Sequence, residues 1–285
     1  MAIRLIAISA ALAVVGAGAV AFGAAALGFW PTAQGDMVKV SAGPATLGYV
    51  YYTGLYGPMS YSVAGFSIDR FEVTNAQYTD FVAATGHAPA AFADDPEFNQ
   101  PDQPVTGVLH EDARSFCTWA GKRLPTELEW EKAARGTDGR TYPWGDGPDL
   151  SRAHLTGEAP VSVGAHSDDI SPYGVRGMAG NVSEWVADTR TARAGVCRDN
   201  AVLDRQATPE MRALLAELAA ANGGVLPEMC LPPEQVDETI PGEPCAYIKG
   251  NSWNGRPHMT VASNRMWDYT NTYAEFVGFR CATDG

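Results

Sequence analysis

The sequence predicts a single α+β domain with little regular secondary structure. Its 285 residues include 30 glycines and 19 prolines, and most of its apolar segments are short, so a loop-rich fold is expected rather than a helical bundle. The length allows one large domain. Residues 111–136 have the apolar spacing and the end signals of two helices joined by a tight corner.

Residues 1–30 are expected to export the rest of the chain. Leu5 to Trp30 is uncharged and almost wholly apolar, and Arg4 precedes it. As a helix this segment would measure roughly 40 Å, against about 30 Å for the hydrocarbon core of a bilayer. That length favours an uncleaved transmembrane anchor, with a cleaved signal peptide as the alternative. Either reading places the domain on the periplasmic or extracellular side, anchored to the inner membrane or secreted.

After a linker at residues 31–36, the domain is expected to occupy residues 37–285. Residues 37–48 alternate apolar and small side chains, which predicts a strand with a turn at Gly43-Pro44. A second strand is predicted over residues 66–73. Together these segments supply the first β-structure of the domain.

Capping residues predict the first helix. Thr74 and Gln77 form a capping box, in which each side chain satisfies a backbone N–H that the helix leaves free. The apolar stripe that follows ends at Gly86. Residues 87–107 contain four of the prolines and predict an irregular loop.

The central helix pair is specified by its corner. The first helix ends at Gly121, and the residues before Pro125 avoid the α conformation. Thr126 and Glu129 then form a second capping box, and Gly136 closes the second helix.

Two later segments are predicted to be irregular or inserted. Residues 136–180 are polar and rich in glycine and proline. So long an irregular segment in a compact domain is usually held in place by a bound metal ion or has a functional role. Residues 189–247 form an insertion that contains cysteines. Within it, Thr208 as N-cap followed by proline predicts a helix.

Six motifs of this chain, in order, resemble the formylglycine-generating enzyme (sulfatase-modifying factor) family. They are FSIDRFEVTN at 66–75, DARSFCTWAGKRLPTELEWEKAARG at 112–136, YPWGD at 142–146, GMAGNVSEW at 177–185, KGNSW at 249–253 and GFRC at 278–281. The resemblance implies that family's fold, a modified C-type-lectin-like α+β domain. It says less about the reaction, because one fold carries many functions.

The resemblance implies a calcium site. In the family, backbone carbonyls at the positions of Gly180 and Val182 and the carboxylate at the position of Glu184 bind the ion, and hard oxygen ligands suit Ca²⁺. The family usually has Asp or Asn where this chain has Gly177, so one ligand is missing. The alternative is that Glu184 pairs with an arginine or with backbone amides.

The family's reaction is the oxidation of a substrate cysteine by copper(I), which two cysteines hold because a soft ion needs soft thiolates. Gly255 and Thr260 stand where those cysteines would be. Ser183 replaces a frequent tryptophan, and Phe276 replaces the asparagine of the active enzymes. Copper is therefore not expected in this chain.

The former substrate cleft still supplies candidate binding residues. They are Ser252, Trp253, Asn254, Arg256 and His258. His258 and Met259 are possible soft metal ligands, and His110 stands where the family often has tryptophan, although a lone histidine is more often structural. Other catalytic templates, such as Gly-x-Ser-x-Gly and His-Glu-x-x-His, are absent from the sequence.

The sequence has five cysteines, and disulfides between them are possible because the domain is expected to be exported. In the family, cysteines in two matching contexts are joined, which implies a Cys117–Cys281 disulfide. Cys197, Cys230 and Cys245 remain in the insertion, so one further pair and one single cysteine are expected.

The net charge of −13 argues against a nucleic-acid partner, because phosphates require clusters of Lys and Arg. The expected function is that of an exported, membrane-anchored binding or accessory subunit, which presents the former cleft to a protein or peptide. One alternative is a divergent periplasmic oxidoreductase that acts in the metal-dependent maturation of a protein or metabolite. Another is a structural subunit of a membrane complex, so whether the protein is an enzyme stays open.

Overall fold

A computed structural model describes residues 36–48, 59–193 and 242–285. The predictions for residues 1–30, for most of the linker and for the helix that begins at Thr208 lie outside these ranges. None of the helices in the described ranges combines the length and the apolarity that a membrane crossing requires.

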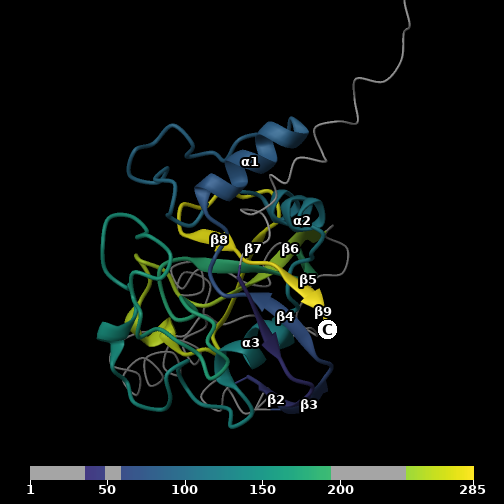
Figure 1. Cartoon of the computed structure of the whole chain (residues 1–285), viewed down its shortest axis with the longest axis vertical. Coiled ribbons are helices and arrows are strands. Elements are labelled where there is room, and N and C mark those ends of the chain that lie inside the picture. The colour runs from purple at the N-terminus through teal and green to yellow at the C-terminus, as the bar shows by residue number, and fades with distance from the viewer. Residues whose placement is uncertain (1–35, 49–58, 194–241) are drawn as a thin grey trace, which may run out of the picture.

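The N-terminal strands form two small sheets. Antiparallel pairing gives the first sheet the order β1 (Met37–Val40), β4 (Phe66–Asp69), β9 (Ala282–Asp284), so the C-terminus lies beside the start of the domain. The second is a hairpin of β2 (Gly43–Leu47) and β3 (Met59–Val63). In Figure 1 this hairpin lies at the end of the molecule opposite α1 and α2.

The turn that the sequence predicted at Gly43-Pro44 is not found there. Both residues belong to β2, where Gly43 pairs with Val63 and Pro44 pairs with Ser62, and the chain turns at residues 41–42 instead. Gly43 has a φ of 140°, a value that favours glycine. Proline is tolerated in β2 because each strand of a two-stranded sheet has one free edge, where no ladder donor is needed.

Helix α1 (Asn75–Thr85) has both of its predicted ends. Thr74 Oγ1 accepts from the Gln77 backbone N–H while the Gln77 side chain accepts from the Thr74 N–H, which is the predicted capping box. Gly86 ends the helix in the left-handed conformation, with its N–H donating to the Val82 carbonyl. Residues 87–107 after it are irregular, as predicted.

Helices α2 (His110–Trp119) and α3 (Glu127–Arg135) form the predicted pair. At the corner, the Lys122 N–H donates to the Cys117 carbonyl at 2.7 Å, and Gly121 takes a φ of 71°. The capping box of Thr126 and Glu129 is present at the start of α3. Local chemistry therefore specifies this element.

A four-stranded sheet completes the domain. Its order is β7 (Arg265–Tyr269), β6 (Gly242–Lys249), β5 (Ser183–Arg193), β8 (Val277–Phe279), and the β5–β8 pair is parallel. The ends of the predicted insertion continue the β5–β6 ladder, from Thr189 opposite Ala246 to Arg193 opposite Gly242.

Within the described ranges, the two remaining regular segments are short 3₁₀ helices. One is Leu150–Arg152, the single helical turn in the irregular segment between α3 and β5, and the other is Pro257–Thr260. Residues 136–182 otherwise have turns, bends and isolated bridges. The prediction of an irregular segment there is confirmed.

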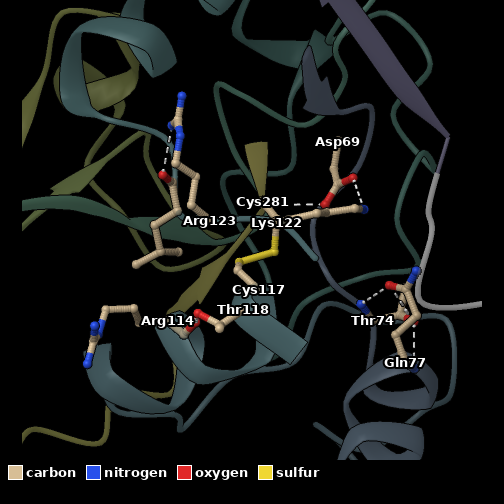
Figure 2. The surroundings of a disulfide bond; sticks show 10 residues. Asp69, Thr74, Gln77, Arg114, Cys117, Thr118, Lys122, Arg123 and Cys281 are labelled. Carbon is tan, nitrogen blue, oxygen red and sulfur yellow. Dashed lines mark hydrogen bonds and ion pairs between the residues drawn. A yellow bond between two sulfur atoms is a disulfide. The ribbon is translucent and has the colours of Figure 1, made fainter. Parts of the chain in front are cut away.

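The core and one disulfide tie these layers together. Phe81, Phe116 and Phe279 join α1, α2 and β8 in one buried cluster, while Trp130 of α3 belongs to a second. Cys117 and Cys281 form a disulfide, the pairing that the resemblance implied. Figure 2 shows Lys122 and Asp69 beside this bridge, joined by an ion pair of 2.6 Å.

Candidate functional site

The loop that follows β6 contains Gly255 and Thr260, the two positions at which the family resemblance implies copper ligands, and the side chain of Asn251 contacts both of them. Asn251 is 1% exposed. Its amide Nδ2 donates to the Arg256 carbonyl and to Thr260 Oγ1, both at 3.0 Å. One amide therefore joins the two ends of the segment in which the family places its two cysteines.

The same amide excludes a side chain at the other cysteine position. A Cβ atom on Gly255 would overlap Asn251 Oδ1, so a cysteine there requires Asn251 to move. Thr260 is buried and offers a hydroxyl in place of a thiolate. Neither position provides the soft sulfur that copper(I) needs, so the residues present do not fit that ion.

Three of the five cleft candidates, Ser252, Trp253 and Asn254, lie on one turn at residues 252–255, and Arg256 follows it directly. The Gly255 N–H donates to the Ser252 carbonyl at 2.9 Å, and Ser252 Oγ lies 2.8 Å from Asn254 Oδ1. Arg256 is exposed, and its guanidinium makes no ion pair within the described ranges. The side chain of the fifth candidate, His258, lies outside the described part of the structure.

Trp253 is the buried member of this turn. It is 7% exposed, its ring centroid lies 6.0 Å from that of Phe98, and its backbone N–H donates to the Asn181 carbonyl. Its indole Nε1 is buried without a hydrogen-bond partner among the described residues. Buried polar groups are normally satisfied, so this donor is an exception among the described residues.

His110 has a structural role. It is buried in α2, its Nε2 lies 2.8 Å from the Val186 carbonyl, and its ring meets the edge of Trp185. Burial lowers its pKa, which keeps the imidazole neutral. Ser183, beside Trp185, is fully buried, and its hydroxyl lacks a partner in the described ranges.

Glu184 is paired with an arginine. Its Oε1 accepts from Arg280 Nη2, and its Oε2 accepts from Arg280 Nε and Trp130 Nε1, all at 2.7 Å. Glu184 and Arg280 are both fully buried. The carboxylate thus has a full set of charge-assisted partners, so these residues fit the arginine alternative better than a calcium ion bound through Glu184. Calcium at Gly180 and Val182 stays a prediction.

Two further carboxyls surround this pair. Glu72 Oε1 accepts from Asn181 Nδ2 at 3.0 Å, and its Oε2 is 3.9 Å from Arg280 and has no hydrogen-bond partner. Asp169 Oδ2 accepts from the Ala179 N–H at 2.9 Å, whereas its Oδ1 is also unpartnered in the described ranges. Burial is the main cause that raises the pKa of each carboxyl to about 7.

Gly177 leaves the space that Glu72 occupies. A Cβ at Gly177 would lie 2.7 Å from Glu72 Oε1 and 2.8 Å from Oε2, and the φ of Gly177 is 70°. The departure from the family's Asp or Asn at this position therefore has a local cause. A carboxylate on residue 177 would meet the carboxylate of Glu72.

A second buried charge cluster holds α3 against the sheets. Glu131 Oε2 accepts from Lys249 Nζ at 2.9 Å, and its Oε1 accepts from Arg135 Nη1 at 2.6 Å and from the Gly48 N–H at 2.8 Å. All three side chains are at least nine-tenths buried.

Sequence reasoning offered an arginine as the partner of Glu184, but it missed Asn251, the two further carboxyls near Arg280 and the whole cluster around Glu131. The available signal was charge placed inside motifs that otherwise read as core, such as Glu72 in FEVTN and Arg280 in GFRC. Buried ionised residues are rare unless they are paired, so such positions indicate internal ion pairs. Which residues pair depends on tertiary contacts between distant segments.

Comparison with known proteins places these observations in a family. Residues 29–285 match the family described as "Sulfatase-modifying factor enzyme 1-like domain". Hercynine oxygenase of Mycolicibacterium smegmatis is 28% identical over an alignment of 298 residues, which covers 89% of this chain and 62% of that protein. Formylglycine-generating enzyme of Thermomonospora curvata is 33% identical over 184 residues, 43% of this chain and 59% of that protein. The chain thus spans about three fifths of the length of these curated relatives.

The likeness extends to solved structures. PvdO from Pseudomonas aeruginosa superposes with a TM-score of 0.60 at 22% identity, covering 88% of this chain and 95% of that one. At this identity the likeness concerns the fold alone. The predicted fold class, a single α+β domain of this type, is confirmed.

Proposed function

This chain belongs to the sulfatase-modifying factor enzyme 1-like domain family, and we propose that it is a copper-free binding or accessory member of that family. In this proposal the domain is exported, held at the outer face of the inner membrane by residues 1–30 or secreted. The former substrate cleft then binds a protein or peptide partner without oxidising it.

The observation that carries this proposal is the position of Asn251. Its amide bridges Thr260 and the carbonyl of Arg256, where a thiolate pair would have to meet. The scaffold around it is intact, with the disulfide, both capping boxes and the turn at residues 252–255 in place. An intact scaffold beside a filled metal position supports binding rather than redox chemistry.

The chemistry of the turn suggests what it binds. Trp253 has an unpartnered indole donor, and Arg256 presents an exposed guanidinium without an acidic partner in the described ranges. Both groups only donate hydrogen bonds. An extended peptide offers matching acceptors, its backbone carbonyls and any acidic side chain.

The test is site-specific crosslinking in the cells that make the protein. A photoreactive residue at Asn254, which is exposed, is expected to capture one discrete partner. The control position is Met59 on β3, 56% exposed, which belongs to the β2–β3 hairpin, a sheet separate from the one that contains β6. Adding Arg256→Ala and Trp253→Phe should abolish the crosslink at 254. The same products from both positions, or none at 254, would overturn the proposal.

The similarity to a hercynine oxygenase over 89% of this chain favours a second candidate, a divergent oxidoreductase that matures a protein or metabolite. In the described ranges, no three His, Cys, Asp or Glu side chains are grouped as a metal site would require. Stoichiometric iron in the purified full-length protein would support this candidate. Fixed partners in every detergent preparation would instead support a structural subunit.

A further inference from the structure

Two histidines lie together outside the former cleft, in the irregular segment between α3 and β5. His154 follows the 3₁₀ helix Leu150–Arg152, and His166 comes from the next turns of the same segment. Their ring centroids are 5.5 Å apart, and the ring planes are inclined by 31°. Both side chains are half-buried.

The ring of His154 is fixed in one tautomer. Its Nε2 lies 3.0 Å from the carbonyl oxygen of Ala159. A carbonyl only accepts, so Nε2 carries the hydrogen and Nδ1 keeps a free lone pair in the neutral ring. Gly157 packs closely on this side, because a Cβ there would lie 2.9 Å from Cε1 and 3.0 Å from Nε2. The ring therefore cannot turn freely.

His166 lies beside this ring. Burial, followed by the neighbouring His154, lowers the pKa of His166, and a hydrogen bond with the backbone of Arg152 partly offsets this shift. In its neutral form this ring, like that of His154, has one nitrogen with a lone pair.

We propose that His154 and His166 together bind a divalent transition-metal ion, of which Zn²⁺, Ni²⁺ and Cu²⁺ are the members that imidazole suits. Two imidazoles that bind one ion at about 2.0–2.1 Å have ring centres roughly 5 to 6 Å apart, which includes the separation seen here. Metal-bound histidines usually donate their other N–H to a carbonyl or carboxylate, as His154 does to the carbonyl of Ala159.

Water completes the coordination in this proposal. The described ranges offer no third histidine, cysteine or carboxylate to the pair. Two protein ligands give an exchangeable ion rather than a structural one, since structural sites are closed by four protein ligands. Calcium is excluded as the occupant because it takes oxygen ligands.

The experiment is a calorimetric titration of the purified full-length protein with Ni²⁺ near neutral pH, after removal of any histidine tag. We expect one Ni²⁺ site in the wild type. In His154→Gln and in His166→Gln, the dissociation constant for Ni²⁺ should be at least about tenfold larger than in the wild type. His87→Gln is the matched control, because that half-buried ring is engaged by Asp112 Oδ1 at 2.8 Å. Its affinity should equal that of the wild type. Unchanged binding in the first two variants would overturn the proposal.

A spectroscopic measurement on the wild type decides the question even if a variant fails to fold. Bound Cu²⁺ should show magnetic coupling to two imidazole nitrogens in its electron paramagnetic resonance spectrum. Coupling to no imidazole nitrogen, or no bound copper at millimolar concentration, would contradict the proposal. Neither result bears on the peptide-binding proposal, because the histidine pair lies outside the turn at residues 252–256.

Discussion

At the residue scale, small changes decide what the former metal position can do. The Asn251 amide donates to the Arg256 carbonyl and to Thr260 Oγ1, in the segment where the family resemblance implies two metal-binding cysteines. Gly255 leaves room for this amide because it has no Cβ. Likewise Gly177 makes room for Glu72, whose carboxyl takes part in the network around Arg280. In both places a glycine that departs from the family pattern lies directly against a polar side chain.

The space at Gly177 can be tested by adding one methyl group. Gly177→Ala should lower the free energy of unfolding by at least about 1 kcal/mol more than Gly86→Ala does. Both glycines have a φ near 70°, so both variants have backbone strain. Only at Gly177 would the new Cβ meet another group, the Glu72 carboxyl, whereas Gly86 faces open space. Urea denaturation measures the difference, and equal losses would show that Glu72 moves aside freely.

Glu72 should make stability depend on pH. Burial, partly offset by Arg280, raises its pKa from 4.5 to about 7, so the folded protein holds this proton more tightly than the unfolded chain. The stabilisation is complete below the unfolded pKa and is lost as the pH rises through about 7.

Glu72→Gln keeps a neutral group that can still accept from Asn181 Nδ2. We therefore expect the free energy of unfolding to fall less between about pH 5 and pH 8 in Glu72→Gln than in the wild type. Denaturant titrations at several pH values provide the comparison. Parallel curves for the two proteins would mean that Glu72 does not hold this proton.

At the element scale, the parts that the sequence predicts well are those with local causes. The capping boxes at Thr74 and Thr126 and the stops at Gly86 and Gly121 depend on residues within one or two turns. The β-structure predicted over residues 37–48 is present as β1 and β2, but the turn predicted at Gly43-Pro44 was wrong, because the hairpin partner of β2, β3, lies beyond residues 49–58 in the chain. Pairing between distant segments has no comparable local signal.

Helix α3 depends on a buried carboxylate. Glu131→Ala should destabilise the protein by about 3–5 kcal/mol, because it leaves Lys249 and Arg135 buried without their common partner. The control is Glu111→Ala in α2, whose partner Arg114 is 61% exposed and for which about 0–1 kcal/mol is expected. Equal effects in chemical denaturation would contradict the proposed role of Glu131.

The disulfide joins α2 to the C-terminal strands. Its cysteines are 164 residues apart, and closing so long a loop is worth about 4–5 kcal/mol in the chain-entropy model. The double variant Cys117→Ala/Cys281→Ala should lose stability of that order, measured by guanidinium titration. Retention of wild-type stability would show that the bridge does not constrain the chain.

At the scale of the whole molecule, the candidate site could be predicted only in part. Missing cysteines at Gly255 and Thr260 were visible in the sequence, and they predicted the loss of copper. The role of the Asn251 amide was not visible in the sequence, because Asn251 reaches Thr260 across the 3₁₀ turn Pro257–Thr260. Arg280 as the partner of Glu184 likewise required the fold, since the two residues lie on neighbouring segments 96 residues apart in the chain.

We propose that this domain keeps the family scaffold without the family's copper chemistry. The decisive measurement is a turnover assay of the purified full-length protein, supplied with copper(I) and a peptide containing Cys-x-Pro-x-Arg, with products read by mass spectrometry. We expect no aldehyde while the Cys117–Cys281 bridge is intact. Formation of the aldehyde would overturn this proposal and would mean that ligands other than residues 255 and 260 hold the copper.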